Sequence, residues 1–455
     1  MVRLIEMGRQ HLGMLATCAL GVTSLAFHLA LFRFGPHPFG YDAGFYRRYL
    51  IEPFASFPNT AVPGLGDDAL VPRIILDLLR LTGLSTDVIL YGSYLAFFAA
   101  LPILVYVLLA RASGVRTAFF AGLLIALSPI QYEAYGSMFW KNAWALVLLF
   151  FAFIAFERKW LYALIAADIA IALSHKTTAV VYILTLCAML LWRARRMEVL
   201  VHIGITGTIL GFVNLSTIQG ALVATPVAYF LGWQDFAWFS IPFLIAIAAV
   251  NVYLRQAPIP RTLIAFGFIA CAYPILHLPF YERIFVFTDI ALAITAAYAI
   301  SYMITYFSTN EHGMRTWLYL TVVCISFTFF AGIVIAQVHE VRPQLSRENV
   351  VRIEEIGSLV SADATILTST SEAPWFEGWT HAHIVAPGML RDTHSLEEWQ
   401  HIWGDATEKE RIDFLADFDH PLYISTFDGF EYLIGTSTPC LREITPYLLI
   451  DECQR

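Results

Sequence analysis

The chain consists largely of apolar runs, each about long enough to cross a lipid bilayer and separated from the next by short polar segments. A transmembrane helix needs roughly 20 apolar residues, because the hydrocarbon core is about 30 Å thick and each helical residue rises about 1.5 Å. Only helices and closed barrels satisfy every backbone hydrogen bond inside lipid. The sequence therefore predicts a polytopic all-α membrane domain of about 11 transmembrane helices, at residues 12–33, 86–110, 115–130, 139–156, 160–174, 177–193, 199–217, 236–254, 262–279, 283–305 and 316–337.

Three of these apolar segments need separate interpretation. Residues 160–191 are too long for one span, and the polar residues 174–176 at their centre favour a tight helical hairpin. The first run is long for a signal peptide and no small-residue cleavage site follows it, so we interpret it as an uncleaved span. The short run 221–231 contains Pro226 and is expected to be a re-entrant or interfacial segment.

Lysine and arginine residues are concentrated in every second short loop of the predicted bundle, and therefore on one side of it. Cytoplasmic loops are enriched in these residues, which sets the orientation of membrane proteins. The N-terminus is accordingly expected in the cytoplasm, and an odd number of spans sends the C-terminal residues outside. The long first external loop, residues 34–85, is an exception with four arginines. The basic residues assigned to the cytoplasmic side are Arg3, Arg9, Arg111, Arg116, Arg158, Lys159, Arg193, Arg195, Arg196, Arg255, Arg261 and Arg315.

Charge divides the chain into two parts. Residues 338–455 contain 21 acidic and eight basic residues, a net charge of −13, whereas the remainder contains 15 and 20, a net charge of +5. With 14% charged residues overall, the chain has too little charge for a soluble protein of 455 residues. We expect a transmembrane domain at 1–337, which includes the first external loop, and an extracytoplasmic domain at 338–455. The acidic tail argues against nucleic acid as a partner, since nucleic acid requires a basic face.

The tail alternates short strand-like and helical segments, which predicts a small α/β soluble domain. Cys440 and Cys453 lie in it and either form a disulfide in an oxidising compartment or remain thiols. The other four cysteines lie inside apolar runs as small core residues. Strands are expected at 364–369, 383–386, 421–426 and 447–450, and helices at 395–403 and 407–418, the last opened by a capping box of Thr407 and Glu410.

The segment after the first span, HPFGYDAGFYRRYL at residues 37–50, combines one acid with aromatic and basic residues. Asp42 precedes an amphipathic helix of about ten residues, and a second amphipathic helix is expected at 72–81. A carboxylate near a low-dielectric boundary can have its pKa raised towards the range of a general base. The alternative is that Asp42 caps the following helix.

With these elements the chain resembles the GT-C superfamily of glycosyltransferases, membrane enzymes that use lipid-phosphate-linked sugars. The resemblance rests on Tyr41-Asp42-x-x-x-Tyr46, on the two juxtamembrane helices after the first span, on the segment 173–178 between spans and on the outer domain after the last span. The sequence departs from the common Asp-Glu pair at Ala43. It also lacks a Trp-Trp-Asp motif, which argues against transfer of a whole oligosaccharide to protein.

The resemblance implies transfer of a sugar from a polyprenyl-phosphate-linked donor to a glycan, lipid or protein acceptor on the extracytoplasmic face. Asp42 would act as the general base of an inverting displacement, with Tyr41 and Tyr46 among the substrate-binding residues. Such a reaction needs no nucleotide-binding loop, and the sequence contains neither GxxxxGK[ST] nor GxGxxG.

Cations at the outer boundary are candidates for binding the donor phosphate. His175 and Lys176 lie in a turn between apolar runs, where ionisable residues often serve a function. Arg283, with Glu282 beside it, and Arg47 are further candidates. Each also has a structural alternative: a polar turn for the first two, an interfacial anchor for Arg283 and a lipid headgroup contact for Arg47.

Glu133, in the expected second external loop at 129–141, is a candidate for binding the acceptor or a divalent cation, or is an ordinary loop residue. Asp42 and Glu133 are too few ligands to decide on a metal, so the requirement for a divalent cation stays open. No other cofactor is implied. Lys141 is interpreted as a side chain that snorkels to the interface at the start of the fourth span.

Three other functions are compatible with the sequence. A transporter or flippase of a lipid-linked substrate would use acids such as Asp168 and Asp289 as relay groups. A non-catalytic membrane protein would bind a partner through its outer domain. A surface-glycan polymerase or ligase would share the lipid-linked donor. The glycosyltransferase hypothesis requires Asp42 to share an outer pocket with His175 and Lys176.

Overall fold

The computed structural model describes residues 2–35, 40–51, 70–192, 195–221, 231–250, 257–278, 281–309, 313–387, 389–390, 394–404, 406–419, 421–426 and 440–452. The chain forms two compact units. Unit 1 comprises Met1–Arg33, Asp68–Pro72 and Tyr91–Arg342, and unit 2 comprises Phe34–Asp67, Arg73–Leu90 and Pro343–Arg455. Unit 2 thus combines parts of the first external loop with the tail.

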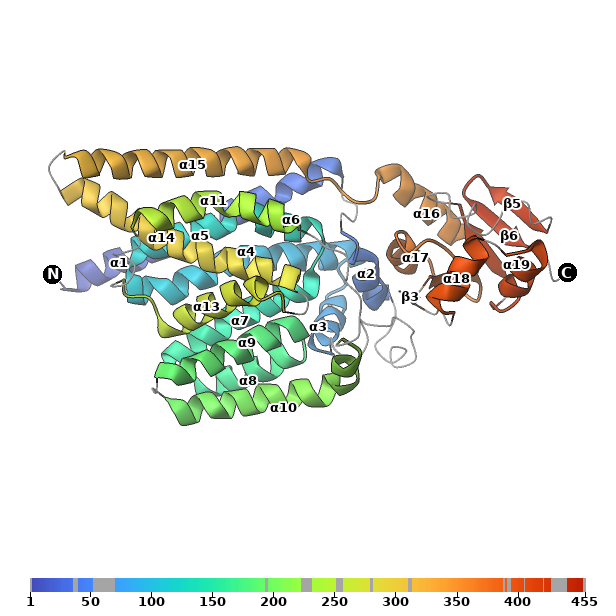
Figure 1. Ribbon diagram of the computed structural model, residues 1–455, viewed down its shortest axis with the longest axis horizontal. Coiled ribbons are helices and arrows are strands. Elements are labelled where there is room, and N and C mark those ends of the chain that lie inside the picture. The colour runs from blue at the N-terminus through green and yellow to red at the C-terminus, as the bar shows by residue number, and fades with distance from the viewer. Residues whose placement is uncertain are drawn as a thin grey trace. The chain divides into compact units, whose positions relative to one another are not determined.

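Within the part of the chain that the structure describes, unit 1 is helical throughout. Each run expected to cross the membrane contains a helix, and these helices lie side by side (Figure 1). They are α1 (Val2–Leu29), α4 (Thr86–Ser113), α5 (Val115–Ala126), α6 (Pro129–Gly136), α7 (Trp140–Arg158), α8 (Leu161–Ala172), α9 (Lys176–Met189), α10 (Arg196–Ala221), α11 (Trp233–Ala249), α13 (Arg261–Ile275), α14 (Phe285–Thr309) and α15 (Met314–Glu340), with short 3-10 turns η1 (Ala30–Phe34), η4 (Leu190–Trp192) and η5 (Tyr281–Ile284).

Six segments of these helices are long and apolar enough to cross a membrane, and a seventh is added if α5 and α6 form one bent span. Four further apolar helices, α8, α9, α11 and α13, have only 12, 14, 17 and 15 residues. The protein is therefore an integral membrane protein with several transmembrane helices, and the count of eleven spans stays a prediction.

The expected hairpin within residues 160–191 is confirmed. Helices α8 and α9 pack against each other, and only residues 173–175 separate them. His175 occupies the N-cap position of α9. The expected re-entrant segment, by contrast, lies mostly outside the described residues, which resume at Leu231.

The expected second external loop begins with a helix that the sequence interpretation missed. Ser128 accepts a hydrogen bond from the backbone N–H of Gln131, and Pro129 follows it at the start of α6. Proline suits the first helical position because its missing N–H would have no partner there. The interpretation of residues 129–136 as loop was therefore wrong, since Pro129 marks a helix start. The bend between α5 and α6 is 41°.

Contacts between helix ends show that the cationic loops assigned to the cytoplasm share one end of unit 1. The Ser113 hydroxyl at the end of α4 donates to the carbonyl of Pro258 (3.1 Å), and the Thr262 hydroxyl donates to Glu157 (2.8 Å). The Arg195 guanidinium donates to the carbonyl of Phe156 (2.7 Å). We call this end the basic end, defined by Arg111, Arg116, Arg158, Lys159, Arg195, Arg196 and Arg261.

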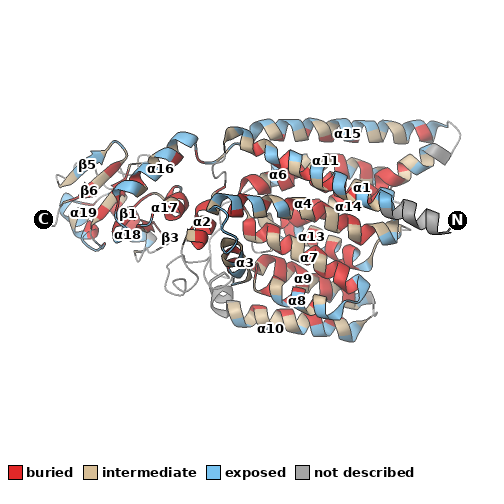
Figure 2. Ribbon diagram, turned by 180° about the vertical axis from the view of Figure 1, so that it is seen from behind, coloured by how far each residue is buried: buried red, intermediate tan, exposed pale blue. Residues whose placement is uncertain are grey.

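The core of unit 1 runs along α14, which is almost wholly buried, whereas most residues of α10 and α15 are exposed or half-buried. Both views place α10 and α15 at opposite edges of the bundle, with the buried residues concentrated between them (Figure 2). Exposed apolar side chains on these two helices, such as Phe212 and Ile325, suit contact with lipid.

Unit 2 contains two helices of the expected first external loop, α2 (Ala43–Ile51) and most of α3 (Leu70–Arg80), which confirm the two expected amphipathic helices. The tail contributes a six-stranded sheet of order β3-β2-β1-β4-β6-β5, in which β1 is parallel to β2 and β4. The remaining elements are α16 (Arg347–Leu359), β1 (Thr365–Leu367), α17 (Ala373–Trp379), β2 (His383–Ala386), β3 (Met389–Leu390), α18 (Leu396–Trp403), α19 (Glu408–Leu415), β4 (Leu422–Ser425), β5 (Leu441–Thr445) and β6 (Leu448–Asp451).

The four expected strands and two expected helices of the tail are confirmed, as is the capping box of Thr407 and Glu410. The sequence interpretation missed β3 and β5, because β3 has two residues and β5 is mostly exposed and polar. It also missed α16 and α17. Cys440 is disulfide-bonded, while the four cysteines of the apolar runs are free. Cys453 lies outside the described residues.

Candidate functional site

Asp42 lies at the position directly before α2, in unit 2. The backbone N–H of Ala43 donates to Gly40 (3.2 Å), and the N–H of Tyr46 donates to the carbonyl of Asp42 (3.3 Å), so a turn leads into the helix. The Asp42 side chain is half-buried. Asp42 therefore lies at the position before the first residue of α2, where the sequence allowed a capping role.

Tyr41 attaches this turn to the tail. Its hydroxyl donates to the carbonyl of Thr370 (2.8 Å), and its ring meets the ring of Trp375 edge-on at 6.0 Å. Burial, and secondly the negative charge of Asp42, raise the pKa of Tyr41 above its ordinary value. Tyr41 thus stays protonated and acts as a hydrogen-bond donor next to the acid.

The two arginines of α2 are engaged within unit 2. Arg47 donates to the carbonyl of Gly378, stacks 4.5 Å from the centre of the Trp379 ring and pairs with Asp87 at 3.2 Å. The buried Arg48 pairs with Glu377 at 3.7 Å. These contacts fix α2 against α17. Tyr46, also on α2, is buried at 1% exposure.

The contact between α2 and α17 depends on glycine. A β-carbon on Gly44 would lie 1.6 Å from the carbonyl oxygen of Pro374, and one on Gly378 would lie 2.5 Å from the α-carbon of Gly44. No side chain fits at either position. Figure 1 shows α2 and α17 side by side as a result. The helix that follows Asp42 is therefore held by backbone-to-backbone packing within unit 2.

His175 and Lys176 occupy the turn between α8 and α9, in unit 1. The His175 Nδ1 accepts a hydrogen bond from the backbone N–H of Thr178 (3.4 Å) and lies 2.9 Å from the Thr178 hydroxyl oxygen. This is an N-cap, and it fixes the imidazole at the first turn of α9. Lys176 is the first residue of this helix.

Three cations converge on His175. The charges of Lys141, Arg283 and Lys176 all act on the buried imidazole. Lys141 is the second residue of α7, Lys176 the first of α9, and Arg283 lies in η5 directly before α14. We call Lys141, His175, Lys176 and Arg283 the cationic cluster. Because helix N-termini carry partial positive charge, the starts of α7, α9 and α14 add to a local field that favours an anion.

Lys141 is the member that the sequence interpretation missed, having been interpreted as a snorkelling anchor. A signal was present in the sequence: predicted span parity places residues 141, 176 and 283 at the same membrane side, each at a helix start. His175, Lys176 and Arg283, which the sequence suggested for the donor phosphate, lie near one another, since the charges of Lys176 and Arg283 act on His175. Their role stays a prediction.

Glu133 lies on α6 with different neighbours. The side-chain amide of Gln337 donates to the Glu133 carboxylate. The charges of Asp235 and Glu340 also act on it, so this part of unit 1 is acidic. Among the residues that the structure describes, no three His, Cys, Asp or Glu side chains are placed to hold a metal ion.

The two intramembrane acids each have polar partners on other helices. Asp168 accepts hydrogen bonds from the Tyr182 hydroxyl (2.8 Å) and pairs with His202 at 2.5 Å. Asp289 accepts from the Ser128 hydroxyl and the Gln131 amide, both at 2.8 Å. The first network joins α8, α9 and α10, and the second fixes the bend between α5 and α6 to α14.

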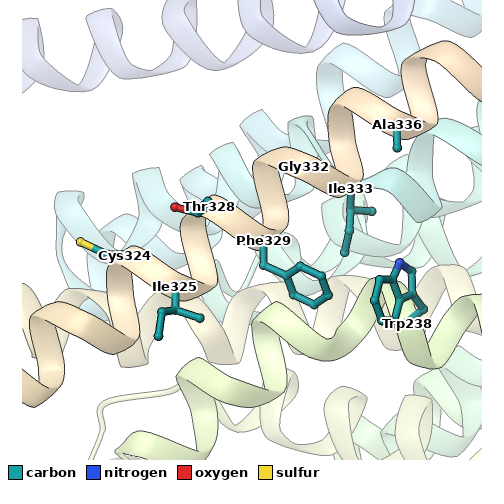
Figure 3. Close-up of a pocket in the computed structure, with 8 residues that line it drawn as sticks. All are labelled: Trp238, Cys324, Ile325, Thr328, Phe329, Gly332, Ile333 and Ala336. Carbon is teal, nitrogen blue, oxygen red and sulfur yellow. The ribbon is translucent and has the colours of Figure 1, made fainter.

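An apolar groove of about 620 Å³ runs along α15 and is closed on one side by Trp238 of α11 (Figure 3). Its far end is Ala336, next to the Gln337 that bonds Glu133. Trp233, at the start of α11, contacts Tyr281 of the same η5 turn that carries Arg283 (ring centres 6.1 Å apart). The groove is lined by Trp238, Cys324, Ile325, Thr328, Phe329, Gly332, Ile333 and Ala336.

No family model matches the chain, and no curated protein matches it in sequence. Solved structures do match in fold. ArnT from Cupriavidus metallidurans bound to undecaprenyl phosphate aligns with a TM-score of 0.58 at 12% identity, over 96% of this chain and 97% of that one.

The oligosaccharyltransferase of Archaeoglobus fulgidus in complex with Zn and sulfate aligns with a TM-score of 0.59 at 12% identity, over 90% of this chain and 68% of that one. In its apo form the alignment spans 64% of the archaeal chain, with a TM-score of 0.55. The chain shares its fold with both of these proteins.

Proposed function

We propose that the protein transfers a sugar from a polyprenyl-phosphate-linked donor to an acceptor hydroxyl. The observation that carries this proposal is the cationic cluster, where Lys141, Lys176 and Arg283 act together on His175 at the starts of three helices. Cations at the starts of three helices favour an anion among them, because helix N-termini carry partial positive charge as well. The fold shared with ArnT, solved with undecaprenyl phosphate, supports a lipid phosphate as that anion.

In this proposal the donor phosphate lies in the cationic cluster and its lipid tail lies along the apolar groove of α11 and α15. Arg283 suits the phosphate because a guanidinium can donate two parallel hydrogen bonds to it. Lys141 and Lys176 add charge. Helix α11 supports this arrangement, because its Trp238 lines the groove and its Trp233 contacts Tyr281 in the turn that carries Arg283.

The orientation proposed for the protein puts the basic end in the cytoplasm, with the cationic cluster and the tail on the extracytoplasmic side. Support comes from the gathering of the cationic loops at one end of unit 1, which is the distribution that cytoplasmic loops show. The acceptor is accordingly a glycan, lipid or protein outside the cytoplasm.

The proposed reaction is a single inverting displacement. The acceptor oxygen forms a bond to the anomeric carbon as the bond from that carbon to the phosphate oxygen breaks. Asp42 takes the proton of the hydroxyl, and the bonding electrons leave with the lipid phosphate. The growing negative charge on the phosphate is stabilised by the cationic cluster, whose charges are already in place before reaction. Tyr41 holds the Asp42 turn, and Glu133 is proposed to bind the acceptor.

Replacing Asp42 by Asn tests the proposal. Sugar transfer is measured in membranes supplied with polyprenyl-phosphate sugars, and activity should fall by about 10²- to 10⁴-fold, the usual contribution of a general base. Asp413→Asn, an exposed acid on α19, is the matched control and should keep full activity. Full transfer by intact Asp42→Asn protein would reject Asp42 as the base.

Proteoliposomes that contain the purified protein test transport. They are loaded with a lipid-linked sugar, and the movement of that sugar across the bilayer is followed together with the glycosylated product. Movement that persists without any product would reject the transfer reaction and support a flippase instead.

A further inference from the structure

A second cleft, with both charged and apolar lining residues, lies at the basic end of unit 1. Its volume is about 320 Å³, and it opens between the last turns of α4 and α7 and the residue before α13. The proposed reaction does not use it. The cleft is lined by Val107, Leu108, Arg111, Ala112, Ile154, Glu157, Arg158 and Pro260.

The cleft is separated from the cationic cluster by the length of one helix. Lys141 is the second residue of α7, and Arg158 is its last. At about 1.5 Å per residue the two lie about 25 Å apart along the helix. That separation approaches the thickness of the hydrocarbon core, so the cleft and the cluster belong to opposite leaflets.

The rim of the cleft is cationic. Arg111 is in the last turn of α4 and Arg158 in the last turn of α7, and both are exposed. The only acid that lines the described part of the cleft is Glu157, whose carboxylate accepts a hydrogen bond from Thr262 (2.8 Å). Two guanidinium groups and one carboxylate leave a net charge of +1 at the rim.

The floor of the cleft is apolar and lies one helical turn deeper. Leu108 and Ile154 precede Arg111 and Arg158 by three and four residues on the same helix faces, which is about one turn towards the bilayer centre. From rim to floor, charged side chains are therefore followed by apolar side chains. A glycerophospholipid has the same order, with a phosphodiester above its acyl chains.

A neighbouring aromatic side chain fixes the depth of the rim. The Arg158 guanidinium stacks 5.0 Å from the centre of the Trp160 ring, and Trp160 is 45% exposed. Tryptophan concentrates at the headgroup level of membranes. Arg158 is thereby held at the depth where phosphates lie, and arginine is suited to bind a phosphodiester through paired hydrogen bonds.

We propose that this cleft is a binding site for one anionic glycerophospholipid, with the phosphodiester on Arg111 and Arg158 and an acyl chain against Leu108 and Ile154. The net charge at the rim matches a single phosphodiester. Basic pockets between helices on the positively charged side of membrane proteins commonly bind such headgroups.

Native mass spectrometry of the purified full chain, titrated with phosphatidylglycerol, tests the site. The wild type should retain one phosphatidylglycerol molecule more than the double variant Arg111→Gln/Arg158→Gln, and the double variant should need about ten-fold more lipid for the same occupancy. Arg196→Gln, an exposed arginine at the same end that does not line the cleft, should bind like the wild type. Equal retention by the wild type and the double variant would overturn the proposal.

Two further binding measurements identify the ligand. Phosphatidylcholine should bind at least ten-fold more weakly, because its cationic headgroup opposes the rim, and equal binding would contradict the site proposed. Inorganic phosphate should not displace phosphatidylglycerol, and full displacement would show a free-anion site instead. Leu108→Trp, which fills the floor while keeping both arginines, should also abolish the extra lipid, so the outcome does not depend on a charge variant that folds poorly.

Discussion

The arginines of unit 2 and the cations of unit 1 belong to the same residue types but have different surroundings. In unit 2, Arg47 and Arg48 contact carbonyl groups, an indole ring and the carboxylates of Asp87 and Glu377. In unit 1, the charges of Lys141, Lys176 and Arg283 act on the same buried side chain, His175. Each of the three cations lies at the start of a helix. The first pair thus has structural partners within unit 2, and the proposal that the second group binds an anionic ligand can be tested against it.

Glu377→Gln should have the largest effect and should act on stability. The Arg48–Glu377 pair is almost completely buried, with side chains 5% and 8% exposed, and removal of one partner leaves a buried charge. The free energy of unfolding should fall by about 3–5 kcal/mol. Denaturant unfolding in detergent, followed by tryptophan fluorescence, measures it.

A matched control uses the exposed pair of Arg352 and Glu348 on α16. Glu348→Gln should change stability by less than about 1 kcal/mol. If Glu377→Gln were as mild, the contrast between the arginines of α2 and the cationic cluster would disappear.

Arg283→Gln should act chiefly on activity. Hydrogen bonds to charged groups contribute about 1.5–3 kcal/mol, which corresponds to about 10- to 100-fold in transfer rate at limiting donor. Arg283→Lys keeps the charge but loses the paired geometry, so it should show an intermediate loss. Transfer rate against donor concentration is the measurement. A loss of stability equal to that of Glu377→Gln would instead assign Arg283 to folding.

Gly44→Ala should have a smaller effect on stability. The added carbon would overlap the Pro374 carbonyl, so α2 and α17 must separate, and overpacking of this kind costs about 1–3 kcal/mol. Sugar transfer should fall with it, since α2 follows Asp42. Gly92→Ala on α4, with no neighbouring atom within 4 Å, is the control and should be neutral or slightly stabilising. Identical behaviour of the two variants would refute the close helix contact.

The smallest expected effect concerns the capping box of α19. The backbone N–H and hydroxyl of Thr407 donate to Glu410 and hold the pKa of its carboxyl below the ordinary value. A carboxyl with a lowered folded-state pKa contributes stability above its unfolded pKa, and this contribution is lost as the pH falls through the folded value. Glu410→Gln should therefore lower the thermal midpoint of the tail slightly at pH 7.

The difference from the wild type should vanish at acid pH, and Glu408→Gln, an exposed acid outside the cap, should show no such dependence. A difference that grows on acidification would contradict the assignment.

The membrane helices could be predicted because a segment that crosses lipid must be apolar along its own length. Each apolar run shows this property without reference to the rest of the chain. The hairpin of α8 and α9 followed from length and from three polar residues. The start of α6 could not be predicted with the same rule, since Pro129 reads as a break unless Ser128 is recognised as its cap. The strands of the tail were predictable where buried, and β5 was not because it is largely exposed.

The candidate site was predictable only where its residues have a local signal. His175 and Lys176 stand out because polar residues interrupt an apolar run, and Asp42 stands out beside the first span. The partners of α2 carry no such signal. Gly378 and Glu377 are more than 300 residues away in sequence from Gly44 and Arg48, and one sequence does not show which distant segments touch.

The glycine contact between α2 and α17 has a practical consequence for protein production. A fragment cut at the end of the last membrane helix would lack residues 41–51, and would leave Trp375, Glu377 and the bare backbone of Gly378 without their counterparts. Such a fragment should be prone to aggregation. A soluble version of the tail would have to carry the α2 peptide with it, either joined through a designed linker or supplied as a separate chain.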